Sequence, residues 1–214
     1  MLWEVDIHLL DPAADHAARA LVAGAAELGI GGCTKGRTAE ARRLLKEAGA
    51  EGIEFELQNR NVDQPYKFLA IWVIEEWSKI GLKAKQKVLP TGPFFDGLRN
   101  GSFDVTIDFN CQGLVNPAMD VAKLLPRSVY NENYGNYEDQ KTIDLYQAML
   151  HESDPAKQRV AMRAYETHVL DTEAHAIMLP WWERIVPMRS YVKGWKVSPS
   201  HYVNQDLATV WLDK

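Results

Sequence analysis

The sequence has few cysteines, no long hydrophobic run and no block of like charges, and each absence narrows what the protein can be. Its two cysteines, Cys33 and Cys111, lie far apart in a chain of 214 residues, so unpaired thiols are the simplest interpretation. The apolar runs are short, and residues 69–74 are followed at once by Glu75 and Glu76, which excludes a spanning helix there. A net charge of −5 argues against nucleic acid as a partner, because such a partner requires a basic surface.

The N-terminus also lacks the basic start of a secretory signal, and it carries charges at Glu4 and Asp6. An export signal, if the protein has one, is therefore not expected within this chain. With 46% hydrophobic and 25% charged residues, the composition is that of a globular protein with a real core.

Periodic patterns predict an α/β fold. Residues 2–9 have a strand pattern, residues 15–29 a helical one, and a glycine-rich joint follows at residues 31–37. After this joint we expect a helix that Thr38 caps and Gly49 ends.

The next segments predict two βαβ units and a mainly parallel sheet. Residues 53–57 alternate as a strand, residues 66–80 form a helix before Gly81, and residues 82–89 alternate again. A short helix then leads to a strand over residues 103–109, with its odd-numbered positions buried.

The last third predicts two helices and short strands. One helix is expected over residues 138–151, and a second begins with Asp154 as cap and Pro155 in its first turn. The inner stripe of the second helix should comprise Ala161, Ala164, Tyr165 and His168. Short strands are expected in the AIMLP segment and in the tail VWLDK.

No motif predicts catalysis, a metal or a cofactor. The glycine-rich joint fails the phosphate-loop spacing because Gly36, not Ser or Thr, follows Lys35. His168 and His175 are seven residues apart and could share a helix face, but the wet end of an amphipathic helix is the simpler interpretation. No nucleophile, base and orienting group stand at a known spacing, so we expect a protein that is not an enzyme.

Two further charged patterns have ordinary explanations. Asp104 and Asp108 fall on the polar side of one expected strand, where solvation explains them. Lys83, Lys85 and Lys87 fall on one face of another strand, where we expect a solvated face or a protected edge.

Several segments, in order, resemble the C-terminal part of family 5 extracellular solute-binding proteins of ABC importers. They are AEARRLLKEAGAEGIEFEL, IEEWSKIGLKAKQKVL, FFDGLRNGSFDVTI and SDPAKQRVAMRAYETHVLDTEAHAIMLPWWERIVPMRSYVKGW, within residues 38–214. The resemblance implies an incomplete lobe of the type II periplasmic-binding architecture, with a mainly parallel sheet flanked by helices. It also implies a bacterial, periplasmic or extracytoplasmic component that binds a peptide or other small solute and works with a membrane permease.

The same resemblance places aromatic residues near the hinge of the binding cleft, and Trp181 and Trp182 stand at the matching position. Successive side chains of an extended segment face opposite ways, so one ring at most should face the cleft, and we choose Trp182. Both rings packing in a core is the alternative.

The loop after the central strand departs from the family. Family members carry an acidic D-P-D stretch there, whereas this chain has Asn116 before Pro117. An amide holds an ammonium group less well than a carboxylate does, so a peptide with a free amine is in doubt. A sugar, an opine-like compound or a neutral oligopeptide segment is an equally open alternative. The polar candidates for ligand contact are Asn110, Gln112 and Asn116, with ordinary loop hydrogen bonds as the alternative.

Residues 1–30 resemble instead the start of the small-subunit-like region of phosphoribosylformylglycinamidine synthase, through LWEVDIH and the A-ELG helix end. This implies a fragment or fusion, with residues 1–37 as one segment and residues 38–214 as the lobe. A component of purine biosynthesis is therefore the alternative function. A protein interaction module built on the tryptophan-rich segment is a third.

Overall fold

A computed structural model describes residues 2–7, 35–110, 116–179, 187–196 and 207–213. Its centre is a five-stranded sheet of order β3-β2-β4-β1-β5. The strands are β1 (Leu2–Ile7), β2 (Glu54–Arg60), β3 (Lys83–Leu89), β4 (Val105–Asn110) and β5 (Ala176–Met178). The expected helix at residues 15–29 and most of the glycine-rich joint lie outside the described residues.

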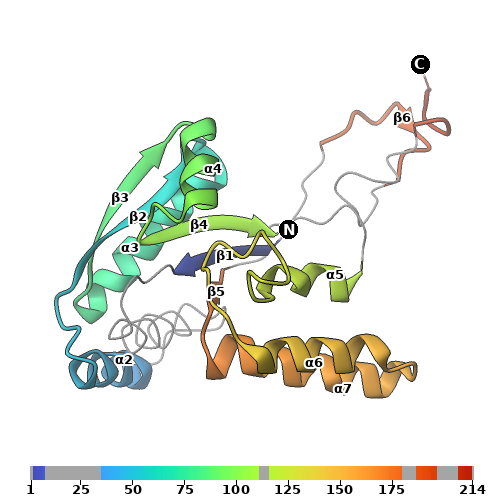
Figure 1. Cartoon of the computed structure of the whole chain (residues 1–214). Helices are drawn as coiled ribbons and strands as arrows, with labels where there is room; N and C mark the ends of the chain where they lie inside the picture. Colours follow the sequence, from blue (N-terminus) through green and yellow to red (C-terminus); the bar gives the residue numbers. More distant parts are fainter. Residues whose placement is uncertain (1, 8–34, 111–115, 180–186, 197–206, 214) are drawn as a thin grey trace.

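The sheet is parallel where the sequence predicts it. Strand β2 pairs in parallel with β3 on one side and with β4 on the other. Strand β1 lies between β4 and β5 and is antiparallel to both. The predicted α/β class with a mainly parallel sheet over residues 53–109 is therefore confirmed, and residues 2–7 are one of its strands (Figure 1). The proposed division at residues 1–37 stays a prediction.

Helices α3 (Phe68–Ile80) and α4 (Thr91–Asn100) connect the parallel strands, and a short kinked segment, η2 (Asp63–Lys67), precedes α3, with Gln64 in an extended conformation. The two helices cover opposite faces of β2. Trp77 of α3 packs edge-on against Phe55, with ring centroids 5.4 Å apart. Gly97 of α4 lies against the side chain of Gln58, which alternation places on the other face.

Helix α2 (Lys35–Glu47) begins earlier than predicted, so Thr38 lies inside the helix and is not its cap. The helix packs through Ala41 and Leu45, which are buried in the main core. That core also contains Val73, Trp77 and Ile107, so α2, α3 and the sheet share one apolar interior.

Strand β3 is an edge strand with a charged face. Lys83 and Lys85 both reach Glu54, at 3.2 and 3.5 Å, and Lys87 reaches Glu56 at 2.6 Å. These ion pairs are exposed, as predicted for this face, so each contributes little stability.

A helical hairpin lies beside the sheet (Figure 1). It consists of α6 (Gln140–His151) and α7 (Pro155–Glu166), which a π-helical turn, η4 (Thr167–Thr172), extends. Asp139 caps α6, and Asp154 caps α7 by accepting hydrogen bonds from the backbone N–H groups of Ala156 and Lys157.

The inner stripe predicted for α7 is correct for Tyr165 and His168, which are buried, and wrong for Ala164, which is exposed. Tyr165 belongs to a second core that it shares with α5 (Pro117–Val121), the 3-10 turn η3 (Ala122–Leu124) and β5. Its hydroxyl donates a hydrogen bond to the Val121 carbonyl at 3.0 Å, which ties the hairpin to the turn.

Near the C-terminus, β6 (Val192–Lys193) and β7 (Trp211–Leu212) form a small antiparallel pair, so the predicted tail strand is confirmed. Gly194 has φ +76 and lies directly against the carbonyl of Thr209, so a side chain there would clash with the partner backbone. Among the described residues, no helix combines the length and apolar character needed to cross a bilayer.

Candidate ligand-binding site

The carboxyl ends of β2 and β4 carry charged side chains on one face of the sheet. Gln58 of β2 pairs with Thr106 of β4, and Arg60 and Asp108 each lie two residues further along their strands. Because side chains alternate along a strand, Arg60 and Asp108 point to the same face. Ligands of open parallel sheets bind outside the carboxyl ends of the strands, so this edge is the candidate site.

Arg60 is held in place by its neighbours on two sides. Its Nε donates a hydrogen bond to Oγ1 of Thr91, the first residue of α4, at 3.1 Å. Its guanidinium carbon lies 5.4 Å from the ring centroid of Tyr66 and 5.7 Å from that of Phe95. The side chain remains partly exposed, so the guanidinium can still donate hydrogen bonds to an anion.

Tyr66 forms the apolar wall beside Arg60. It is 3% exposed and packs edge-on against Phe94 and Phe109, with centroid distances of 6.0 and 6.3 Å. Burial, with a contribution from the Asp108 charge, raises the pKa of Tyr66 to about 12, although Arg60 acts in the opposite direction. The phenol therefore stays neutral at any physiological pH.

Asp108 and Lys123 form a buried ion pair next to this wall. Nζ of Lys123, in η3, lies 2.7 Å from Oδ2 of Asp108 and donates a longer bond of 3.4 Å to the Phe109 carbonyl. Both side chains are 6% exposed, and the lysine nitrogen lies 5.6 Å from the ring centroid of Tyr134. The expectation that solvent surrounds Asp108 is therefore wrong, because η3 covers this end of β4.

The remaining oxygen of Asp108 is buried and has no hydrogen-bond partner in the described part of the chain. Asp104 differs, since it is exposed and its Oδ2 accepts a hydrogen bond from the Glu56 backbone N–H at 3.0 Å. We call Arg60, Tyr66, Asp108, Lys123 and Tyr134 the strand-end cluster; it carries two positive charges and one negative charge.

Two of the five residues predicted to contact ligand fall within the described part of the chain. Asn110 ends β4, and Asn116 is exposed and caps α5, its Oδ1 accepting the Ala118 N–H at 2.9 Å. Trp181, Trp182 and Gln112 lie outside the described residues. All five stay predictions.

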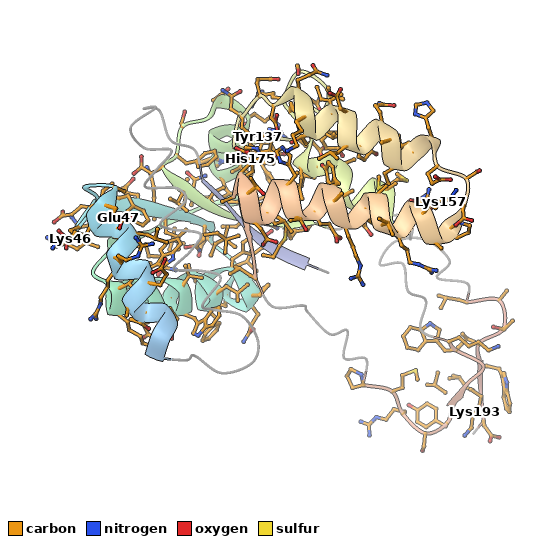
Figure 2. All side chains as sticks on the ribbon, turned by 90° about the horizontal axis from the view of Figure 1, so that it is seen from below. Lys46, Glu47, Tyr137, Lys157, His175 and Lys193 are labelled. Atoms are coloured by element: carbon orange, nitrogen blue, oxygen red, sulfur yellow. The ribbon has the colours of Figure 1, made fainter. Side chains whose placement is uncertain are left out.

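The two histidines do not share a helix face: His168 lies within η4, whereas His175 lies beyond it and beside Tyr137 (Figure 2). His168 is buried, with Nε2 2.6 Å from Oδ2 of Asp139, so the expectation of a wet helix end is wrong for it. His175 lies beyond η4 and stacks on Tyr137, with centroids 3.5 Å apart. The described residues hold no group of three or more side chains suited to a metal.

Sequence reasoning missed Arg60, Tyr66 and Lys123. Arg60 could have been found as the charged residue that ends an alternating strand. Lys123 carries no such signal, because it stands alone in an irregular segment and meets Asp108 only through the fold.

No protein-family profile matches the chain. The dipeptide-binding protein of Pseudomonas aeruginosa PAO1 is 29% identical over 167 residues, which are 75% of this chain and 31% of that protein. Di/tripeptide-binding protein 1 of P. aeruginosa UCBPP-PA14 is 38% identical over 74 residues, 32% of this chain and 14% of that protein. The chain thus spans less than a third of the length of these curated relatives.

Among solved structures, the ABC transporter-associated periplasmic binding protein DppA of Helicobacter pylori, in complex with the peptide STSA, superposes with a TM-score of 0.79. It is 16% identical, and the match covers 100% of this chain and 48% of that one. The chain folds as one lobe of a periplasmic binding protein. MoaA from A. tumefaciens R10, in complex with mannopinic acid, has the same lobe at a TM-score of 0.68, with 13% identity over 83% of this chain and 42% of that one.

These matches confirm the resemblance of the lobe to family 5 solute-binding proteins. The matches also concern the alternative function, a component of purine biosynthesis. The relatives named above are binding proteins, and nothing in the comparisons supports a component of purine biosynthesis.

Proposed function

We propose that the chain is a substrate-binding lobe of an ABC importer and binds a small peptide or similar solute without chemical change. The dipeptide-binding relatives and the shared lobe support this. By the same likeness, we place it in the periplasm or an equivalent extracytoplasmic space, with a membrane permease as its partner. In this proposal, the protein is not an enzyme.

The observation that carries the proposal is Arg60 at the carboxyl end of β2. Thr91 and two aromatic rings fix its guanidinium, which stays partly open. A planar guanidinium donates two parallel hydrogen bonds to a carboxylate, and aromatic walls exclude water from those bonds. Arg60 would therefore hold the carboxylate end of the solute.

We also propose that the five contact residues predicted from the sequence take part in binding the solute. Trp182 would cover the apolar part of the solute, with Trp181 packed inward. Asn110, at the end of β4, and Gln112 and Asn116, which follow it in sequence, would supply hydrogen bonds. Closure against a second lobe by a hinge motion would then bury the solute.

A titration of the ¹⁵N-labelled chain with N-acetyl-Ala-Ala tests the role of Arg60 by NMR. We expect shifts at the ends of β2 and β4, and in the Arg60 Nε–H signal, identified by its loss in R60Q. The R60Q variant should weaken binding about tenfold or more, because a charge-assisted pair is lost. Arg159, exposed on α7, provides the matched control R159Q, which should bind as the wild type does.

An amidated ligand distinguishes binding of the carboxylate from non-specific binding of the peptide. N-acetyl-Ala-Ala amide should bind the wild type about as weakly as the free acid binds R60Q. If the amide and the acid bind alike, Arg60 does not hold a carboxylate and the proposed function loses its main support.

A further inference from the structure

Lys123 places an ammonium group inside the strand-end cluster. Its Nζ lies 2.7 Å from Oδ2 of Asp108 and within 5.6 Å of the Tyr134 ring centroid. A carboxylate and an aromatic ring are also the partners that would receive an ammonium group of a ligand. The protein therefore fills with its own side chain the place that a ligand amine would need.

The charges around Lys123 are mixed. Arg60 and Lys123 are positive and Asp108 is negative. Besides burial and Asp108, Glu132 lies close enough to raise the pKa of the Tyr134 hydroxyl, and Glu4 of β1 stands opposite Asp108 in the strand register. An ammonium group that approached Asp108 would still meet the ammonium group of Lys123, and like charges repel strongly in a region of reduced dielectric constant.

We propose that the solute is a carboxylate whose amino end is blocked or absent, such as an N-acylated peptide, because Lys123 occupies the ammonium position and adds positive charge. This inference rests on the proposed function and names its ligand class. Displacing Lys123 by a ligand amine would exchange one ammonium for another and would force a buried lysine into a new environment, so it brings no gain.

The test compares two ligands on the unaltered chain. N-acetyl-Ala-Ala and Ala-Ala share a carboxylate and differ in the charge of the amino end. We expect N-acetyl-Ala-Ala to bind with a Kd about tenfold lower, from NMR shifts at the ends of β2 and β4. Equal affinity, or tighter binding of Ala-Ala, overturns the inference and leaves the proposed function standing. If neither ligand binds, the proposed function fails and the inference with it.

Variants test whether Lys123 is the cause. In K123M the Asp108 carboxylate loses its internal partner, so Ala-Ala should gain affinity and the preference should shrink or reverse. The double variant D108N/K123M removes both charges, so that no buried carboxylate is left without its ion-pair partner. It should still bind N-acetyl-Ala-Ala through Arg60, and it should prefer N-acetyl-Ala-Ala over Ala-Ala less strongly than the wild type does.

The control K157M removes an exposed lysine of α7 and should keep the wild-type preference for N-acetyl-Ala-Ala over Ala-Ala. A preference unchanged in the double variant would contradict the role of Lys123.

Discussion

At the residue scale, Asp139 joins two segments through its charge. Its carboxylate accepts hydrogen bonds from the N–H groups of Lys141 and Thr142 and from the Thr142 hydroxyl, and it meets His168 at 2.6 Å. Burial alone would raise the pKa of Asp139, but the bonds from Thr142, His168 and Lys141 outweigh it and lower the pKa from 3.8 to about 2. The carboxylate form is thus bound more strongly in the folded protein than in the unfolded chain.

The lowered pKa of Asp139 determines how its contribution to stability changes with pH. A lowered folded pKa stabilises above the unfolded value of 3.8, and the gain is lost as pH falls toward 2. D139N keeps a side-chain oxygen for capping but removes the charge, so it should lower the free energy of unfolding by about 2 kcal/mol at pH 7. Urea unfolding from pH 7 to pH 2.5 should show this difference shrinking below about pH 4. The exposed cap variant D154N is the control, and an equal, pH-independent loss in both would contradict the assignment.

Individual side chains were the least predictable part of this protein. Alternation places Asp108 on the polar side of its strand, yet the fold lays η3 over that side and buries the carboxylate against Lys123. Ala164 fits the helical stripe but is exposed, and the neighbouring core includes Tyr165 and Val169 instead. Burial of a single residue depends on which distant segment covers it, and a periodic pattern holds no information about that.

At the element scale, glycines end the helices as predicted, and one of them allows a sharp test. Gly81 follows α3 with φ +98, and nothing lies within 4 Å of a Cβ built there. The cost of G81A would therefore be backbone strain and not collision. It should lower the free energy of unfolding by about 1 kcal/mol or more.

Gly92 is the matched control for this substitution. It lies in the first turn of α4, a Cβ there also has open space, and its φ is not in the left-handed region. G92A should leave stability unchanged or raise it by about 0.5 to 1 kcal/mol, because alanine favours a helix. Chemical denaturation of both variants decides the point, and a loss in G92A equal to that in G81A would show that conformation at Gly81 is unimportant.

Most elements could be predicted because their signals are local. The alternation of Phe55 and Leu57, the stripe of Val73 and Trp77, and the cap at Asp154 all depend on neighbours within a few residues. The early start of α2 at Lys35 could not, since a glycine-rich segment gives no helical period and Thr38 offers a plausible cap.

At the scale of the whole molecule, the strand–helix–strand order along the chain made the parallel part of the sheet predictable, but not its antiparallel side. The pairing of β1 between β4 and β5 joins segments more than 90 residues apart, and a strand pattern alone does not reveal its partners. The strand-end cluster has the same origin, because Arg60, Asp108 and Lys123 come from three separate segments. The cluster could be recognised only in the folded structure, where the ends of β2 and β4 and the turn η3 come together.

The single lobe also limits how tightly the chain can bind on its own. In the proposed function, the solute is enclosed between two lobes, whereas this chain supplies one wall with Arg60 at its edge. A Kd of 1 mM corresponds to about −4 kcal/mol and a Kd of 1 μM to about −8 kcal/mol, so losing about half of the contacts moves a micromolar site toward the millimolar range. We therefore expect the chain alone to bind N-acetyl-Ala-Ala with a Kd near the millimolar range, measured by NMR titration. Micromolar binding by the isolated chain would mean that the described lobe holds a complete site, and that the solute does not depend on closure of a second wall.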